Sequence, residues 1–257
     1  MHLEDRGWLA VGSSVRGIGH ERSGLPGQDA HDLRVEGAWL VAAVADGAGS
    51  APLAQVGAPI AAREAVGGAV ALLAAGVPAD DDAWRTFCRR VLEGARKAVE
   101  TETATRRASS RDLASTLIVT VAGPDVVVAA QIGDGASVCE DGDGQVCSLT
   151  RPPKGEYVNE TTFLVSPGAL DTAQTVVQRK SIRRLALFSD GLQMLALRLS
   201  DGAAHGPFFK PMFEFIAQVT DGGSAEGELE GFLLSPRIRD RADDDLTLVL
   251  AARRACG

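Results

Sequence analysis

Residues 41–50, VAAVADGAGS, combine an apolar run with an abrupt end at Asp46. The run has the brevity and β-branching of a buried strand, and the four small residues that follow indicate a turn. A single Asp-Gly pair of this kind is most often a turn whose carboxylate bonds to the backbone. The same pattern recurs, however, at Asp134 in QIGDGAS and at Asp190 in LALFSDGL. Several predicted strands therefore end in an acid.

A further segment, RADDDLTLVLAA, has the reverse order, so that Asp243, Asp244 and Asp245 precede the apolar run. Four other Asp-Gly pairs have no apolar run before them and predict ordinary turns: Asp141-Gly142, Asp143-Gly144, Asp201-Gly202 and Asp221-Gly222. Acids gathered at buried strand ends repel one another unless they are protonated or neutralised by cations. Hard divalent ions such as Mg²⁺ or Mn²⁺ take oxygen ligands of this kind. The sequence thus predicts a carboxylate metal site.

Length and composition favour a single domain over residues 1–257, because 45% hydrophobic content can form one large core and no linker-like stretch interrupts it. The formal charge of -8 argues against a nucleic-acid partner, which requires a basic face. We expect no membrane partner, because no apolar run reaches the length of a bilayer span. The N-terminus MHLEDRGW lacks the basic and apolar regions of a signal peptide, so we expect a cytoplasmic protein.

The cysteines lack the paired spacing of a zinc site, which predicts free thiols in a reducing compartment: Cys88, Cys139, Cys147 and Cys256. Cys139 and Cys147 flank EDGDGQ, a predicted hairpin turn that would bring them close across two strands. We do not expect a disulfide between them.

Hydrophobic periodicity predicts two groups of strands separated by pairs of helices. Strands are expected over residues 8–15, 113–122, 126–132, 136–139, 145–149, 185–189 and 246–252. Helices are expected over residues 52–75, 80–107, 192–199, 207–219 and 225–234. Trp84 and Phe87 recur at helical spacing in the second helix, and we expect them in the core.

Between the first strand and Asp46 lies the polar, Gly-rich segment RGIGHERSGLPGQDAHDL. It places several polar side chains close together: Arg16, His20, Arg22, Gln28 and Asp29. The spacing between Asp29 and Asp46 fits a turn and one strand, so an antiparallel pair could bring the two acids together. Solvated loop residues are the alternative interpretation of Arg16 and His20.

Residues 150–175 contain three prolines, the only tyrosine of the chain and no sustained period. Long loops without secondary structure inside a domain are often lids or binding loops, which predicts a flap over the site. The alternative is a solvated excursion.

Six short motifs, taken together and in order, resemble the metal-dependent protein phosphatases (type 2C). They are QDA at 28–30, VADGAGS around Asp46, AST at 114–116, IGDG at 132–135, FSDGL at 188–192 and DDLTLVL at 244–250. Two further segments, HxxxGLPxQDA at 20–30 and GEYxNETTF at 155–163, resemble a bacterial subgroup of that family.

The resemblance implies an α+β fold with four layers, in which two antiparallel β-sheets pack face to face and a helical layer covers each. It also implies a centre of two Mn²⁺ or Mg²⁺ ions, with a possible third, at one end of the sandwich. Carried over by position, Asp46 bridges both ions, Gly47 offers its carbonyl, Asp29 binds through water, Asp190 and Asp244 bind the other ion, and Asp134 with Asp190 holds the third. Asp46, Asp190 and Asp244 would be the catalytic acids.

Three positions depart from the family pattern. Gln28 stands where members usually have an acid, and Ala48 stands where many eukaryotic members have a histidine. The family's phosphate-binding arginine has no counterpart in SGLPG, so Arg16, His20 or Arg22 would substitute. We favour Arg16, then His20, because a guanidinium can bind phosphate with two parallel hydrogen bonds.

The implied function is hydrolysis of phosphoserine and phosphothreonine on proteins, by water activated at the two ions. The partners would be phosphorylated proteins, the targets of a bacterial Ser/Thr kinase. One alternative is a weak or inactive pseudophosphatase that binds phosphoproteins as a regulator, and the retained acids argue against it. Another is a hydrolase of small phosphoesters, which only the substrate spectrum would distinguish.

Overall fold

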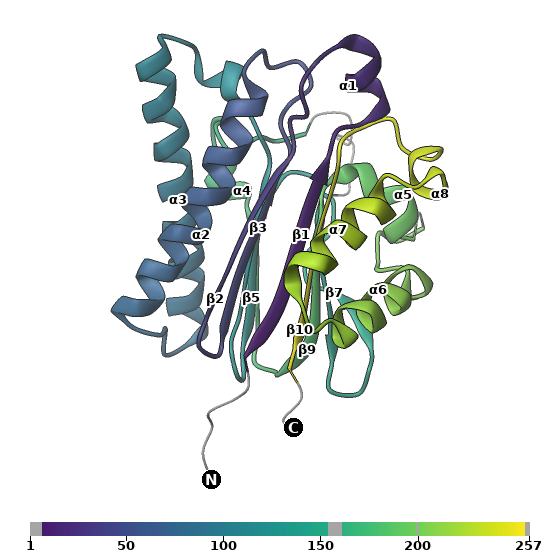
Figure 1. Cartoon of the computed structure of the whole chain (residues 1–257). Coiled ribbons are helices and arrows are strands. Elements are labelled where there is room, and N and C mark those ends of the chain that lie inside the picture. Colours follow the sequence, from purple (N-terminus) through teal and green to yellow (C-terminus); the bar gives the residue numbers. More distant parts are fainter. Residues whose placement is uncertain (1–6, 154–160, 199, 255–257) are drawn as a thin grey trace.

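The structure, a computed structural model, describes residues 7–153, 161–198 and 200–254. Within these residues, two five-stranded antiparallel sheets pack face to face (Figure 1). One sheet has the order β1 (Trp8–Val15), β10 (Leu246–Arg253), β9 (Ile182–Phe188), β6 (Ala136–Asp141) and β7 (Val146–Ser148). The other has the order β2 (Ala30–Glu36), β3 (Trp39–Ala45), β4 (Leu117–Ala122), β5 (Val127–Ile132) and β8 (Gln174–Gln178).

A pair of helices covers the outer face of each sheet (Figure 1). The long helices α2 (Ala54–Ala75) and α3 (Asp81–Arg106) pack on the sheet that contains β3. The helices α6 (Gly206–Gln218) and α7 (Gly222–Leu233) pack on the sheet that contains β10. This arrangement confirms the predicted four-layer αββα sandwich.

Strand β3 explains why residues 41–45 are apolar at every position. Successive side chains of a strand point to opposite faces, and here both faces are buried. Leu40, Ala42 and Val44 pack between the two sheets. The alternate residues Val41, Ala43 and Ala45 pack beneath the α2–α3 layer. The apolar run therefore supplies two cores at once, and it ends where the strand reaches Asp46.

Helix α2 corrects the expectation that no stretch of the chain could span a membrane. By length and composition alone, residues 54–75 are long and apolar enough to do so. Alanine and glycine make up the buried face of this helix almost entirely, and it packs closely on β2, β3, β4 and α3. Such packing is typical of a core helix in a globular domain.

Several expected boundaries are wrong, each for a local reason. The strand expected from residue 113 begins at Leu117, because η1 (Ser110–Leu113) forms a 3₁₀ turn closed by a capping box between Ser109 and Asp112. The helix expected over 192–199 is short: η2 (Asp190–Leu192) and α5 (Gln193–Ala196) are followed by a bridge from Leu197 to Ala204.

Three further short helices were not expected from the sequence pattern. They are α1 (Ile18–Ser23), α4 (Ala169–Thr172) and α8 (Pro236–Arg239). The segment predicted as a flap over 150–175 contains α4 and the first residues of β8. Residues 154–160, which include Lys154, Glu156, Tyr157, Asn159 and Glu160, lie outside the described residues.

Candidate metal centre

Acids from both sheets meet at one end of the sandwich. Asp29 precedes β2 and Asp46 follows β3, and the antiparallel register pairs the neighbouring residues Ala30 and Ala45. The two carboxyl groups are consequently close enough for the charge of Asp29 to raise the pKa of Asp46. This is the pairing that their sequence spacing predicts.

Two more acids lie close to Asp46. Asp134 lies in the turn between β5 and β6, and Asp190 begins η2 directly after β9. Because Ala136 of β6 pairs with Phe188 of β9, the two acids lie at the same sheet end. One carboxylate oxygen from each of Asp46, Asp134 and Asp190 lies within 4.8 Å of the others.

The ionisation of these acids reflects their crowding. Burial raises the pKa of Asp29 to about 7, with a further rise from the Asp245 charge and an opposing effect of the Ser189 hydroxyl. Burial, followed by the charges of Asp29 and Asp190, raises the pKa of Asp46 well above its usual value. Burial, followed by the charges of Asp134 and Asp244, raises the pKa of Asp190 to about 6. The cluster therefore holds protons that a cation would displace.

The unpaired oxygens of the cluster fit a divalent ion. Asp29, Asp134 and Asp190 each have a buried Oδ1 with no hydrogen-bond partner among the described residues. Their other oxygens are fixed in two cases: Ser189 Oγ donates to Asp29 Oδ2 at 2.6 Å, and Thr161 Oγ1 donates to Asp134 Oδ2 at 2.7 Å. Buried oxygens without partners are costly, and carboxylates are the ligands that Mg²⁺ and Mn²⁺ prefer.

Backbone contacts fix the position of Asp46. Its N–H donates to Thr116 Oγ1 at 3.0 Å, and the Thr116 N–H donates back to the Asp46 carbonyl at 2.8 Å. Gly47 is held just as closely, because a Cβ there would lie 2.7 Å from Ala54 Cβ and 2.8 Å from the Gln28 carbonyl oxygen. Only glycine therefore fits directly after Asp46.

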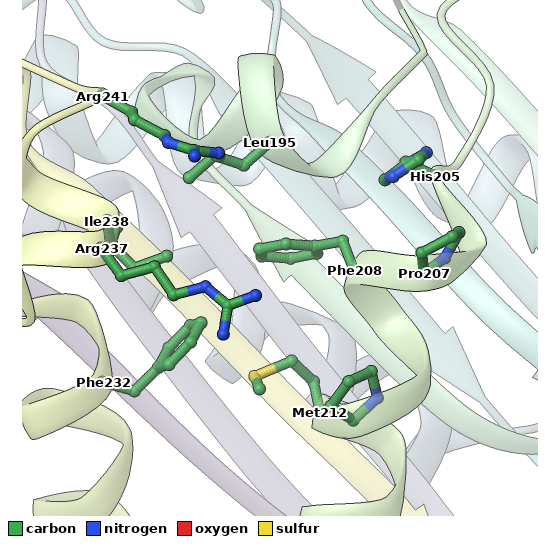
Figure 2. A pocket seen from close by; sticks show the side chains of 10 residues that line it. Leu195, His205, Pro207, Phe208, Met212, Phe232, Arg237, Ile238 and Arg241 are labelled. Atoms are coloured by element: carbon green, nitrogen blue, oxygen red, sulfur yellow. The ribbon is translucent and has the colours of Figure 1, made fainter.

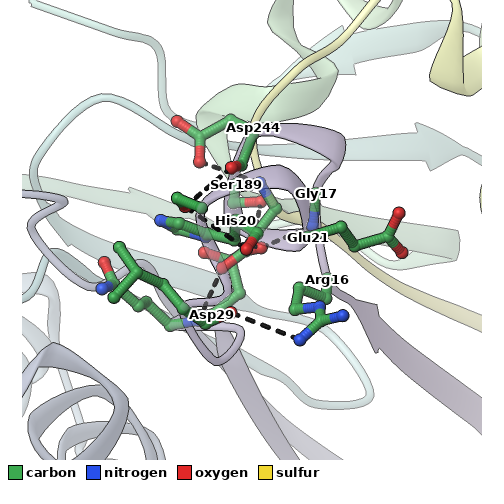
Figure 3. Close-up of polar contacts among 12 residues, drawn as sticks. Arg16, Gly17, His20, Glu21, Asp29, Ser189 and Asp244 are labelled. Carbon is green, nitrogen blue, oxygen red and sulfur yellow. Dashed lines mark hydrogen bonds and ion pairs between the residues drawn. The ribbon is translucent and has the colours of Figure 1, made fainter.

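Asp245 is a buried anchor whose role the sequence pattern does not indicate. Its carboxylate is buried and accepts hydrogen bonds from the N–H groups of Gly17, at 2.6 Å, and Gln28, at 2.5 Å. His20 Nδ1 lies 2.9 Å from the same carboxylate (Figure 3). Asp245 thus joins the segment that carries Asp29 to the start of β10.

Asp244, the neighbour of Asp245, is exposed, and its charge acts on both Asp46 and Asp190. It also belongs to a second group of potential metal ligands, together with His20 and Asp245. The Asp244 carboxylate is therefore placed between the predicted metal acids and the Asp245 anchor.

The candidate phosphate-binding residues differ in their surroundings. Arg16 is exposed directly after β1, and its Nη1 donates to the Leu25 carbonyl at 3.4 Å (Figure 3). Arg22 is exposed on α1. Because His20 faces Asp245, Arg16 is the better placed of the two to contact a phosphate.

A separate pocket of about 230 Å³ lies between α5, α6, α7 and α8. Figure 2 shows Arg237 extending into the space between Phe208, Met212 and Phe232. Its lining contains no carboxylate and does not overlap with the acid cluster.

The sequence is similar to known proteins over most of its length. The family model for protein phosphatase 2C matches residues 16–234. The chain is 34% identical to serine/threonine-protein phosphatase 3 of Escherichia coli strain K12, over 95% of this chain and 98% of that protein.

Solved structures of low sequence identity show the same fold. Serine/threonine phosphatase Stp1 from Staphylococcus aureus superposes with a TM-score of 0.66 at 13% identity and covers 99% of each chain. The catalytic domain of the serine threonine protein phosphatase PstP, in complex with 2 manganese ions, gives a TM-score of 0.57 at 16% identity. That match covers 97% of this chain and 99% of that one.

Proposed function

Because the chain belongs to the protein phosphatase 2C family and is a metal-dependent serine/threonine phosphatase, we propose that its acid cluster forms a centre for two Mn²⁺ or Mg²⁺ ions. Asp46 would contact both ions, with Asp29 and the Gly47 carbonyl on one side and Asp190 and Asp244 on the other. Asp134, with Asp190, would hold a third ion. The observation that carries this proposal is the set of buried, unpartnered oxygens on Asp29, Asp134 and Asp190.

When bound, such ions lower the pKa of a coordinated water and polarise phosphoryl oxygens. The residues of the chain supply position and charge. Ser189 orients Asp29, Thr161 orients Asp134, and Thr116 fixes the backbone of Asp46. No serine or cysteine nucleophile is required, since the attacking group is water.

Substrate contact is assigned to Arg16. It is exposed at the end of β1 that carries the acid cluster, and a guanidinium suits a phosphate dianion. Phosphoserine and phosphothreonine proteins would be the substrates, in particular the targets of a bacterial Ser/Thr kinase, in keeping with the name of the E. coli relative. We also propose a cytoplasmic location, with α2 as a core helix and not an anchor.

The test is turnover of a phosphothreonine peptide and of p-nitrophenyl phosphate by EDTA-treated protein, before and after addition of Mn²⁺. We expect no turnover without the ion, recovery with it, and a loss of about 10²-fold or more in Asp46→Asn and Asp190→Asn, because each change removes a ligand charge. Asp143→Asn, in an exposed turn, is the matched control and should retain full activity.

Full activity in EDTA would contradict the metal centre. Binding of the phosphopeptide without any turnover would instead indicate a pseudophosphatase. Turnover of p-nitrophenyl phosphate and sugar phosphates, with none of the phosphopeptide, would indicate a hydrolase of small phosphoesters.

For Arg16→Ala we expect a higher KM for the phosphopeptide with metal affinity unchanged.

A further inference from the structure

Two of the cysteines face each other on the β6–β7 hairpin. Cys139 and Cys147 are directly paired in the register, and their Sγ atoms lie 3.4 Å apart. Cys139 is fully buried, whereas Cys147 is partly exposed. Reagents can therefore reach one sulfur of the pair, while the other is positioned to react with it.

A cation lies beside the accessible sulfur. Lys180, in the turn between β8 and β9, places its Nζ 3.4 Å from Cys147 Sγ and 3.9 Å from Asp141 Oδ2. Reactive cysteines have partly exposed surroundings of this kind, in which a nearby positive charge stabilises the thiolate. Cys88, in contrast, is buried, and burial raises the pKa of its thiol to about 12.

The structure assigns Cys147 as a thiol that reacts with peroxides and soft electrophiles, and Cys139 as the residue that resolves the product to a disulfide. This site is independent of the acid cluster and of the phosphatase chemistry.

The electrostatics of the hairpin agree with this assignment. The hydrogen bond from Cys139, followed by the Lys180 charge, lowers the pKa of Cys147 to about 6, against the effects of burial and of Asp141. The same hydrogen bond, together with burial, raises the pKa of Cys139. The pair therefore has an attacking thiolate and a protonated partner at neutral pH.

The reaction is balanced by hydrogen peroxide as oxidant. The Cys147 thiolate attacks one peroxide oxygen, the O–O bond breaks, and a sulfenic acid forms with release of hydroxide. The Cys139 thiol then attacks the sulfenic sulfur, and the S–S bond forms with loss of water. Two thiols lose two electrons and two protons, and the peroxide becomes two water molecules.

The register of the hairpin brings the two cysteines within the Cα separation of a disulfide. The Leu149 N–H donates to the Ser137 carbonyl, and the Asp141 N–H donates to the Gln145 carbonyl. By the alternation of an antiparallel ladder, the cysteine pair between them also occupies a hydrogen-bonded position, with Cα atoms about 5.5 Å apart. That separation lies within the range observed for disulfides.

The test uses the full, reduced chain with peptide mapping by mass spectrometry. At neutral pH, iodoacetamide should modify Cys147 at least about tenfold faster than Cys88, because Cys147, unlike the buried Cys88, is partly exposed and stabilised as thiolate. One equivalent of hydrogen peroxide should yield a Cys139–Cys147 peptide that has lost two hydrogen atoms and is restored by dithiothreitol. In Cys139→Ser, a dimedone adduct should form on Cys147 instead.

Lys180→Gln should slow both reactions, whereas Arg179→Gln, which removes the adjacent cation that pairs with Asp81, should not. Circular dichroism would establish that each variant is folded. Equal alkylation rates at Cys147 and Cys88, or the absence of the cross-linked peptide after peroxide, would overturn the assignment. Equal rates in the two cation variants would overturn the role of Lys180.

Discussion

Asp245 connects two segments that lie far apart in the sequence. Its carboxylate accepts from the N–H groups of Gly17 and Gln28, next to the first predicted metal acid, and it contacts His20. Gly17 can approach so closely only because it lacks a side chain: a Cβ there would lie 2.2 Å from the Asp244 carbonyl carbon. The anchor therefore sets where Asp29 and Asp244 stand relative to each other.

Asp245→Ala should destabilise the metal-free protein by about 3 kcal/mol, because two buried N–H groups lose their acceptor and each costs about 1–3 kcal/mol. Asp245→Asn should destabilise the protein less. Its amide oxygen still accepts one of the two hydrogen bonds, and the charge that acts on Asp29 is removed. Urea unfolding in EDTA measures both. The exposed neighbour gives the control: Asp243→Ala should stay within about 0.5 kcal/mol of the native protein. Equal stability of Asp245→Ala and Asp243→Ala would refute the anchor.

At the scale of residues, sequence patterns found the acids that follow or precede buried strands, and missed the anchor. Asp29, Asp46, Asp134 and Asp190 stand out because each adjoins an apolar run or a turn. Asp245 also adjoins such a run. Its partners, however, are backbone N–H groups more than 200 residues away. Every residue except proline has such a group, so the residue types do not indicate this contact.

At the scale of elements, α2 fixes the loop that holds Asp46. A Cβ on Gly57 would lie 2.0 Å from the Leu113 carbonyl oxygen, at the end of η1. From there, the chain continues through Ala114, whose carbonyl accepts from the Ala48 N–H at 2.9 Å, to Thr116. The close packing of α2 on η1 therefore fixes, through these backbone contacts, the loop at the end of the sandwich that carries the acid cluster.

Gly57→Ala should destabilise the protein by about 1–3 kcal/mol, as expected for overpacking against rigid backbone. It should also weaken Mn²⁺ binding, because the Leu113–Thr116 segment must shift. Gly67→Ala, in the same helix with open space around the new methyl group, should stabilise by up to about 1 kcal/mol. Thermal unfolding and calorimetric titration with Mn²⁺ measure the two effects. If both substitutions stabilise, the contact with Leu113 does not constrain α2.

The sequence predicted the long elements better than the short ones. Helices α2 and α3 and strands β1, β5 and β10 lie within a few residues of their expected positions, because their periodic patterns are long. The expected strand over 113–122 and helix over 192–199 fail where a capping box and a long-range bridge compete with propensity. Such tertiary contacts have no periodic signal.

At the scale of the whole molecule, the acid cluster exists only when the two sheets pack. Asp29 and Asp46 belong to one sheet, Asp190 and Asp244 adjoin the other, and Asp134 lies on the connection between them. Folding therefore forces buried carboxylates together, and the metal-free protein bears a repulsion that the unfolded chain does not. This repulsion has a measurable pH dependence.

In EDTA, we expect the Tm to fall as the pH rises from 5 to 8. Asp29 and Asp190 have folded-state pKa values raised to about 7 and about 6, and Asp46 is raised as well. Raised values mean that the folded state holds protons that the unfolded chain releases, so the stabilisation is complete at low pH and is lost as the pH passes through 6 to 7. His31, whose pKa is lowered by burial, and Cys147, whose pKa is lowered to about 6 by the hydrogen bond with Cys139, act in the opposite direction, but they are two groups against three.

Differential scanning calorimetry at constant ionic strength, at pH 5.5 and pH 8, measures this dependence. Mn²⁺ should raise the Tm most at pH 8, because the ion replaces the protons and binds the deprotonated acids. Asp190→Asn in EDTA should show a smaller fall than the native chain, since one of the three acids with a raised pKa is gone while His31 and Cys147 are unchanged. A metal-free Tm that rises over this range, or an Asp190→Asn profile as steep as the native one, would show that the acid cluster does not carry the repulsion that the fold implies.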